Sequence, residues 1–449
     1  MSWRTELLGT LITESRILCE NPHPNRRIRV KLNVAGVEKR PVENEIEGAT
    51  KQFVRKAGQF IFGKQNFHKG AFGIIPNELD GFETSADIPS FDVSDDCYAE
   101  WIYYYFKIGN RFKELEKIAR GVGSKRIHPE QIAAIEIPLP SKEVQEELLR
   151  RFNRIESQNG QIAAELNHQL ALVKELRQAY LREAMQGKLV PQDPTDEPAE
   201  ILLEKIKAEK EKLIAEKRIK RDKPLPPINA EETPFEIPSN WTWCRLGEII
   251  STIFDGPFGS HLKTADYTES GVQVIRLENI GFTKFNSEKL TFISEEKYKT
   301  ISQHTVYEND ILVSSFIADG VKTTLIPKLN YIAIAKADCF TVRTPKDWVA
   351  KKFIVFALGS QPIFDEFLQF SHGMTRLRIN TTQLRKVMFP LPPLAEQERI
   401  VGKLEKLMKF CDELEANIKE GITNANRLLQ TALKEALEPK DNRRAAQLD

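Results

Sequence analysis

Two stretches of the chain repeat one pattern of apolar and polar positions, and that pattern predicts two long helices. Residues 121–185 align without a gap with residues 373–437, at an offset of 252. Apolar residues recur there at spacings of three and four, which places them along one helix face. The positions of this face are Leu148, Phe152, Ile155, Asn159, Ile162, Leu166, Gln169, Val173, Leu176, Tyr180 and Ala184, and, in the second stretch, Ile400, Leu404, Leu407, Cys411, Leu414, Ile418, Gly421, Ala425, Leu428, Ala432 and Ala436. A mostly apolar face with this spacing is typical of a coiled-coil seam, so the protein is built twice around two such helices.

Each long helix follows a Pro-Leu-Pro segment, at residues 138–140 and 390–392. Ser141 can cap the first helix, because its side chain can accept from an unpaired N–H of the first turn. Gly187 is the kind of residue that ends a helix. About 45 residues at 1.5 Å each form a rod of roughly 65–70 Å. Such a helix can act as a spacer as well as part of a core.

The region before the first long helix has the pattern of a globular unit. Short apolar runs between turn residues predict strands at residues 28–32, 58–63 and 73–76. Residues 95–119 predict a helix with one apolar face. We interpret the large residues on that face as core rather than as a platform for stacking on bases: Trp101, Tyr104, Tyr105, Ile108 and Phe112.

A second globular region carries two short echoes of the first. Residues 246–250 echo residues 8–12, and residues 308–313 echo residues 57–62. Between these landmarks the two regions differ greatly. Variable regions inside a repeated frame suggest two reading heads on one scaffold.

A connector rich in proline and charge lies between the two halves, at residues 188–240. Residues 200–220 have a helical pattern whose sparse apolar positions are Ile201, Leu202, Ile206, Leu213 and Ile214. We interpret this segment as a solvated helix with ion pairs four residues apart, in preference to a nucleic-acid contact.

Composition adds limits to this picture. The net charge is +1, with 41% hydrophobic and 29% charged residues, as in a soluble globular protein. The five cysteines and seven histidines are scattered, which argues against a zinc site. No apolar run is long enough to span a membrane, and residues 1–10 contain no apolar segment followed by a signal-peptide cleavage site, so we expect a cytoplasmic protein. Charge is uneven: residues 23–69 hold eleven Lys/Arg against four Asp/Glu, and residues 372–386 hold four basic residues and no acid.

Catalytic signatures are missing from the sequence. It contains no phosphate-binding Gly-x-x-x-x-Gly-Lys-Ser/Thr loop and no Gly-x-Gly-x-x-Gly cofactor loop. It also lacks an adenine-methyltransferase Asn/Asp-Pro-Pro-Tyr/Phe motif, a Gly-x-Ser-x-Gly elbow and a His-Glu-x-x-His helix. We therefore expect a chain without catalytic activity.

The duplicated Pro-Leu-Pro helix, together with residues 63–75, resembles the specificity subunit of a Type I restriction-modification system over almost the whole chain. The resemblance implies an α+β fold with two α/β target recognition domains, separated by two long antiparallel coiled-coil helices with a pseudo-twofold repeat. It implies DNA with a bipartite target, two modification (methyltransferase) subunits and restriction (translocase/nuclease) subunits as partners. S-adenosylmethionine, ATP and Mg²⁺ would then belong to those partners, and this chain would hold no cofactor or metal. The corresponding boundaries are 1–140 and 241–392 for the recognition domains, 141–187 and 393–438 for the spacer helices, 188–240 for the linker and 439–449 for a flexible tail.

Candidate DNA contacts follow from residue type, since phosphates attract Lys and Arg while base edges are read by Arg, Asn, Gln, Lys or Ser. In the first half they occupy a polar loop and the segment after a Gly-x-Gly turn: Lys64, Gln65, Asn66, His68, Lys69, Lys125 and Arg126. In the second half they are Ser260, His261, Lys263, Ser315, Arg376 and Arg378. By the second echo, Ser315 occupies the place of Lys64. The alternative for each residue is ordinary surface or loop structure.

Two other functions remain open from the sequence. A coiled-coil scaffold that binds only proteins would make the basic segments incidental. A self-contained nuclease or methyltransferase would need a site that none of these motifs reveals.

Overall fold

The computed structural model describes residues 3–41, 50–121, 125–370 and 377–437. The chain divides into two compact units. The first unit comprises Met1–His168 with Ile418–Asp449, and the second comprises Gln169–Asn417. Each unit therefore contains one globular region and one part of each long helix.

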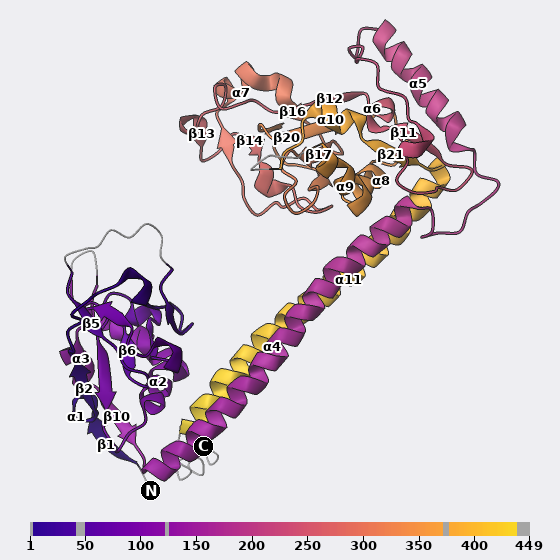
Figure 1. Ribbon diagram of the computed structural model, residues 1–449. Coiled ribbons are helices and arrows are strands. Elements are labelled where there is room, and N and C mark those ends of the chain that lie inside the picture. Colours follow the sequence, from indigo (N-terminus) through magenta and orange to yellow (C-terminus); the bar gives the residue numbers. More distant parts are fainter. Residues whose placement is uncertain (1–2, 42–49, 122–124, 371–376, 438–449) are drawn as a thin grey trace, which may run out of the picture. The chain divides into compact units, whose positions relative to one another are not determined.

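The first unit is built on a four-stranded antiparallel sheet in the order β2-β9-β6-β7, of which β2 and β6 are labelled in Figure 1. Its strands are β1 (Arg4–Leu7), β2 (Ile12–Ser15), β3 (Ile28–Val30), β4 (Val37–Lys39), β5 (Gln52–Val54), β6 (Phe60–Phe62), β7 (Phe72–Ile74), β8 (Glu83–Ser85), β9 (Ser90–Val93) and β10 (Glu136–Leu139). Its short helices are α1 (Leu8–Leu11), α2 (Ala99–Lys107) and α3 (Pro129–Ala133), with 3₁₀ turns η1 (Pro24–Arg26), η2 (Phe67–Lys69), η3 (Asn77–Leu79) and η4 (Ile108–Lys117). The predicted strands at 28–32, 58–63 and 73–76 are confirmed as β3, β6 and β7.

Phenylalanine rings fill the core of the first unit. Phe60 and Phe62 of β6 pack with Phe67, Phe72 and Phe106 at ring-centroid distances of 4.8 to 6.3 Å. All five side chains are fully buried or nearly so. Rings of this size contribute much of the apolar area that folding removes from water.

The single helix predicted over residues 95–119 is wrong in its length. Helix α2 ends at Lys107, and Gly109 (φ 67°) and Asn110 (φ 56°) then adopt left-handed backbone before η4 continues. Glycine and asparagine tolerate this conformation best, so they break the helix here. The assignment of the aromatic face to the core is confirmed: Trp101, Tyr104, Ile108 and Phe112 are buried, and Tyr105 packs against them.

The second unit contains a four-stranded antiparallel sheet, β12-β20-β17-β18, and a five-stranded mixed sheet, β13-β15-β14-β19-β16. Its strands are β11 (Thr242–Arg245), β12 (Thr252–Phe254), β13 (Tyr267–Thr268), β14 (Val272–Ile275), β15 (Phe292–Ile293), β16 (Thr305–Val306), β17 (Ile311–Ser314), β18 (Thr323–Leu325), β19 (Ala333–Ala335), β20 (Cys339–Arg343) and β21 (Met388–Leu391). Its helices are α5 (Ala199–Ala215), α6 (Leu246–Ile249), α7 (Glu295–Ile301), α8 (Lys351–Leu358), α9 (Gln361–Gln369) and α10 (Thr381–Lys386), with 3₁₀ turns η5 (Ala230–Glu232), η6 (Thr264–Asp266), η7 (Leu277–Asn279) and η8 (Ser302–His304).

The sequence echoes correspond to one structural frame that occurs in both units. Strand β1 pairs with β10 so that Arg4 faces Leu139, and β11 pairs with β21 so that Thr242 faces Leu391. Helices α1 and α6 follow β1 and β11, and helices α3 and α10 precede β10 and β21. Each pair of strands therefore joins the start of its globular region to the segment that leads into a long helix.

Close packing explains why both echoes contain a Leu-Gly pair. A Cβ on Gly9 would lie 3.1 Å from the Ala133 carbonyl oxygen, and a Cβ on Gly247 would lie 2.9 Å from the Arg385 carbonyl oxygen. Only glycine lets the short helix approach the partner helix this closely.

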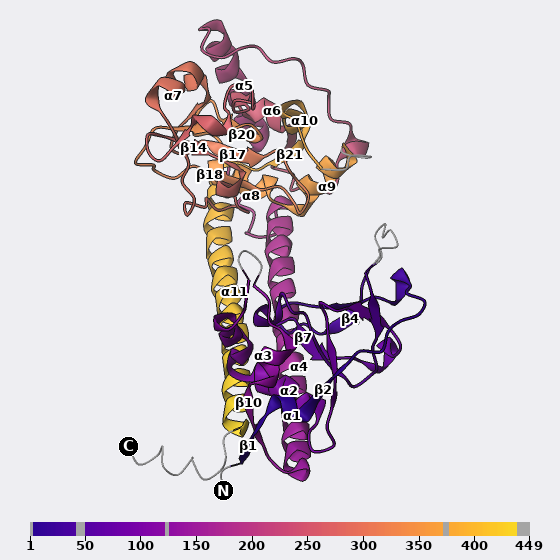
Figure 2. The same ribbon diagram turned by 90° about the vertical axis from the view of Figure 1, so that its left-hand side faces the viewer.

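The long helices are α4 (Lys142–Met185) and α11 (Leu394–Leu437), which run side by side (Figure 1 and Figure 2). In the first unit, Phe152 shares a core with Leu433. In the second unit, Arg177 forms an ion pair with Asp412 at 2.8 Å. Residue numbers rise along one helix as they fall along its partner, so the pairing is antiparallel.

The predicted helix face is mostly buried or half-buried, and two positions are corrections. Ile162 is half exposed and Leu428 largely exposed, while the neighbouring Leu429 packs on the core and Leu433 is buried. An α-helix has 3.6 residues per turn, so a strict seven-residue pattern drifts around the helix and the buried face moves by one position. The side chain of Ala436, the last position of the predicted face, is not among those that the structure describes.

Helix α5 is more than a solvated linker helix. Its Leu202, Leu203, Ile206 and Leu213 side chains are buried, and the first three belong to the main core of the second unit. Ile201, on the opposite side, is exposed. The connector therefore contributes an amphipathic helix to the second unit.

Candidate nucleic-acid interface

In the first unit, the Arg-Ile segment before the long helix is fastened to the end of a central strand. The Ile127 N–H donates to the Lys64 carbonyl (2.8 Å), and the Lys64 N–H donates to the Asp87 carbonyl (2.9 Å). The Arg126 guanidinium then reaches the Asp87 carboxylate, with 3.2 Å between Nη1 and Oδ1. Both side chains stay about half exposed. This arrangement presents an ordered arginine at the surface.

The second unit repeats this arrangement with other side chains. The Ile379 N–H donates to the Ser315 carbonyl (2.9 Å), and the Ser315 N–H donates to the Asp338 carbonyl (2.9 Å). Arg378 Nη2 lies 3.6 Å from Asp338 Oδ2, and its guanidinium lies 4.1 Å from the centre of the Phe316 ring. A cation over an aromatic face is attracted by the ring, which restrains the arginine further.

The two clusters correspond position by position, and the expected equivalence of Ser315 and Lys64 holds in their backbone hydrogen bonds. The aspartates were not among the sequence candidates. The offset of 251 that relates Lys64 to Ser315 also relates Asp87 to Asp338. This common offset is the one feature of the sequence that could have pointed to the two aspartates. Their contacts with Arg126 and Arg378 are seen only in the fold.

The other candidates of the first-unit loop differ in exposure. Gln65 and Lys69 are exposed, and Lys64 and Asn66 are half-buried. His68 is only 9% exposed, and its buried Nδ1 has no hydrogen-bond partner among the described residues. Burial lowers the pKa of this imidazole, so it is neutral near pH 7. A direct phosphate contact from His68 therefore does not fit its placement.

Lys125 lies beside the same loop but already has a partner. Its ammonium is 2.8 Å from the Glu116 carboxylate, and this hydrogen bond lowers the pKa of Glu116. The ion pair is half exposed, so it is weak and a phosphate could compete for the lysine.

In the second unit, the candidate loop at residues 255–263 is anchored at its base. Asp255 Oδ1 accepts from the Asp338 N–H at 2.8 Å. Burial raises the pKa of this Asp255 carboxyl. Ser260, His261 and Lys263 follow in the loop and are exposed. Asp338 thus links this loop to Arg378.

Ser315 does not present its side chain to solvent. It is 2% exposed, and its hydroxyl donates to Asp338 Oδ1 at 2.7 Å. Its placement favours support of Asp338 over the predicted DNA contact. Arg376 lies outside the described residues.

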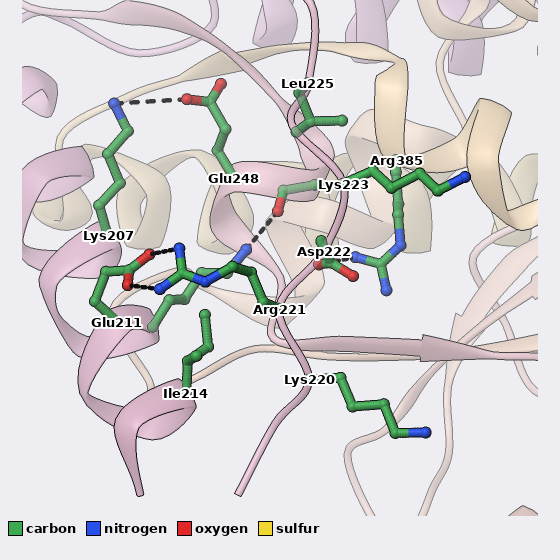
Figure 3. Close-up of a pocket in the computed structure, with 12 residues that line it drawn as sticks. Lys207, Glu211, Ile214, Lys220, Arg221, Asp222, Lys223, Leu225, Glu248 and Arg385 are labelled. Carbon is green, nitrogen blue, oxygen red and sulfur yellow. Dashed lines mark hydrogen bonds and ion pairs between the residues drawn. The ribbon is translucent and has the colours of Figure 1, made fainter. Parts of the chain in front are cut away.

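A charged pocket of about 340 Å³ lies beside α5 in the second unit (Figure 3). Its walls carry both signs of charge: Glu211 pairs with Arg221, and Asp222 pairs with Arg385 at 2.5 Å. The Lys210 ammonium donates to a backbone carbonyl of α6 (2.6 Å), and burial lowers its pKa. These contacts attach the connector to the second unit. Because Arg221, Arg385 and Lys210 already bind groups of the protein, the pocket does not have the character of an anion site.

Among the described residues, no group of three or more His, Cys, Asp or Glu side chains could hold a metal ion. No described helix is both long and apolar enough to cross a membrane. The arrangement instead offers exposed cationic and amide groups at the ends of two matched sheets.

The fold defines a duplicated α+β protein with two paired long helices. The family model described as "Type I restriction modification DNA specificity domain" matches residues 33–171 and 238–424, and the chain belongs to this family.

Similar proteins carry related names. The Type I restriction enzyme EcoAI specificity subunit of Escherichia coli is 35% identical over 252 residues, which cover 56% of this chain and 42% of that protein. The Type I restriction enzyme MjaVIII specificity subunit of Methanocaldococcus jannaschii is 22% identical over 382 residues. This match covers 84% of this chain and 75% of that protein. The matches to the E. coli EcoAI and EcoEI subunits thus span less than half of those longer relatives.

One solved structure supports the fold independently. A chain from a study of complex assembly and conformational transition in a type I restriction-modification system superposes with a TM-score of 0.59. It is 18% identical, and the match covers 97% of each chain. The α+β fold with paired helices and an internal repeat is therefore confirmed.

Proposed function

We propose that this chain is the non-catalytic DNA-specificity subunit of a Type I restriction-modification complex. The observation that carries the proposal is the repeated Arg–Asp cluster, which sits in the same backbone frame in both units but is surrounded by different side chains. A constant frame with variable contacts suits two readers, each of which recognises one half of a bipartite DNA target. Lys64, Gln65, Asn66, Lys69 and Arg126 would serve the first half.

In the second unit, Ser260, His261, Lys263 and Arg378 are the corresponding proposed contacts, with Arg376 added from its charge. Lysine and arginine would hold phosphates, and Ser260 and Arg378 can hydrogen bond to base edges. The Arg378 guanidinium is restrained by Asp338 and by the Phe316 ring.

The two long helices would set the spacing between the two half-sites. Forty-four residues of α4 correspond to a length of about 66 Å. Interhelical contacts such as the Arg177–Asp412 ion pair support a fixed register. Faces outside the pairing surface would dock two modification subunits, and restriction subunits would join that assembly.

Chemistry would reside in those partners within a cytoplasmic complex. The modification subunits would hold S-adenosylmethionine and methylate adenine, and the restriction subunits would use ATP and Mg²⁺. This chain would contribute the choice of DNA sequence alone.

The first test combines target mapping with binding. Methylated adenines are mapped after co-expression with the cognate modification subunit, and a duplex with the mapped target is titrated at several salt concentrations. We expect affinity to fall steeply with salt, because lysine and arginine displace counterions from phosphates. A salt-independent affinity would contradict the proposal.

Modularity is tested by exchanging residues 241–390 for the matching segment of a relative. Only one half of the methylated sequence should change. A change in both halves would contradict separate readers.

Charge reversal separates DNA recognition from a scaffold that binds only proteins. Replacement of four basic residues by glutamate should abolish target binding: Lys64→Glu, Lys69→Glu, Arg376→Glu and Arg378→Glu. Lys212→Glu and Lys299→Glu, on exposed lysines of α5 and α7 outside the long helices, are the matched controls. If the four site reversals leave methylation intact, the scaffold function is favoured.

A further inference from the structure

Each unit pairs an exposed arginine with an aspartate from a different segment. Arg126 lies 39 residues from Asp87 in the sequence, and Arg378 lies 40 residues from Asp338. Both pairs are held in the same backbone frame, so their repetition comes from the fold rather than from a local sequence motif.

The carboxylate engages only part of each guanidinium. Arginine has five N–H donors in a rigid fork. In the first unit, one nitrogen, Nη1, faces Asp87 at 3.2 Å. In the second unit, Nη2 faces Asp338 at 3.6 Å, and the Phe316 ring covers one face of the fork. Within the part of the chain that the structure describes, the remaining guanidinium donors have no hydrogen-bond partner, so they are available to a ligand.

Asp338 is itself held in place by hydrogen bonds with Ser315 and Asp255. Its carboxylate accepts from the Ser315 hydroxyl (2.7 Å), its N–H donates to Asp255 (2.8 Å), and its backbone is left-handed (φ 71°). An aspartate in this conformation is uncommon and needs surrounding contacts to hold it. The buried Ser315 hydroxyl therefore acts on the carboxylate, which in turn faces Arg378.

We propose that Asp87 and Asp338 are specificity-positioning residues, an inference that rests on the DNA-reading function proposed above. Each carboxylate orients its arginine so that the free donors of the fork meet a base edge of the correct half-site. The same negative charge repels phosphates that approach in the wrong register. Orientation lowers the entropy lost on binding, and repulsion disfavours other sequences.

The positioning role of the aspartates can be tested apart from a purely structural role, because the two roles depend on different atoms. The N–H of Lys64 donates to the Asp87 carbonyl, and the N–H of Ser315 donates to the Asp338 carbonyl, so these loop closures need no carboxylate. Asparagine keeps those backbone bonds and can still accept from the Ser315 hydroxyl. Asp→Asn therefore removes the charge that faces the arginine and leaves the frame intact.

The experiment uses the full chain in complex with its modification subunit, as wild type, Asp87→Asn or Asp338→Asn. Binding is measured for the mapped target duplex and for duplexes in which the first or the second half-site is scrambled. Each variant should lower the ratio of target to scrambled affinity about tenfold, the range of one specific base contact. The loss should be confined to the half-site read by the altered unit, while affinity for fully scrambled DNA is unchanged or higher.

Matched controls are Asp95→Asn in the first unit and Asp347→Asn in the second, both on exposed aspartates. A double variant, Asp338→Asn with Arg378→Lys, should lose little more than Arg378→Lys alone, since both changes remove one interaction. Thermal melting of each variant verifies that the frame is folded.

The outcomes separate the two proposals. If the wild-type complex does not distinguish target from scrambled DNA, the proposed function fails. If the wild type distinguishes them and the Asp→Asn variants match it, or lose affinity equally for both duplexes, only the positioning role is overturned.

Discussion

Gln145 and Gln397 lie 252 residues apart and make the same two hydrogen bonds, each within its own unit. Gln145 Nε2 donates to the Pro140 carbonyl (3.0 Å), and Gln397 Nε2 donates to the Pro392 carbonyl (2.9 Å). Their Oε1 atoms accept from backbone N–H groups at the N-terminal starts of α2 and α8, at 3.0 and 2.8 Å. Both side chains are fully buried. Each glutamine thus fastens a long helix to its globular region.

Replacing either glutamine by leucine should destabilise its own unit. The substitution leaves a half-buried N–H and a buried carbonyl without this partner, and an unsatisfied buried group costs about 1–3 kcal/mol. Chemical denaturation measures the loss. Gln161→Leu, on an exposed glutamine of α4, is the control and should change stability by about 0.5 kcal/mol or less. Equal effects at Gln145 and Gln161 would contradict the fastening role.

Arg55→Ala should strongly destabilise the first unit. Arg55 is 1% exposed and donates to the Ser15 and Ile88 carbonyls and to the Thr84 and Ser90 hydroxyls, at 2.6 to 3.1 Å. Burial lowers its pKa to about 10, so it is still charged near pH 7.

The loss of these bonds should lower the free energy of unfolding by about 3 kcal/mol or more. Thermal melting with first-unit fluorescence follows the change. Arg16→Ala, at an exposed ion pair with Glu14, should cost less than about 1 kcal/mol. A small effect of Arg55→Ala would mean that water replaces the lost donors.

Glu366→Gln should remove a pH dependence of stability in the second unit. Both carboxyl oxygens lie 3.0 Å from the Met388 N–H, and burial raises the pKa of Glu366 from 4.5 to about 7. Between these pH values the folded state keeps a proton that the unfolded chain has lost. The free energy of unfolding therefore falls as pH rises from 4.5 to 7, by on the order of 3 kcal/mol.

Melting temperatures between pH 4.5 and 8 measure this slope for wild type and Glu366→Gln. The melting temperature of Glu366→Gln should change less with pH than that of the wild type, because the glutamine amide does not titrate. Arg245 and Glu232 also act on this carboxyl, so the control for a general loss of acid is Glu269→Gln, on an exposed glutamate of the same unit. Parallel slopes for wild type and Glu366→Gln would assign the pH dependence to another group.

Gly421→Ala should stabilise the first unit. The added Cβ would lie 3.6 Å from the Leu166 methyl groups, an ordinary contact distance. Alanine also reduces the freedom of the unfolded chain, so we expect a gain of about 0.5–1 kcal/mol. Gly402→Ala, in the same helix with open space around it, tests the backbone effect alone. A loss at Gly421 but not at Gly402 would show that the helices cannot accommodate the methyl group.

The sequence by itself determined the duplication, the two long helices and several core strands, because these follow from periodicity over neighbouring residues. Helix positions three and four apart share a face wherever the helix is placed. The family resemblance rests on the same repeated stretches, and the family match confirms it.

Only the tertiary structure decided the contacts between distant segments. Asp87 and Asp338 meet their arginines across about 40 residues, and α5 buries one face on the second unit. The buried face of α11 includes Leu429 in place of the expected Leu428, and this change depends on how the helix packs on its partner. These features arise from packing and register in three dimensions, which local spacing does not encode.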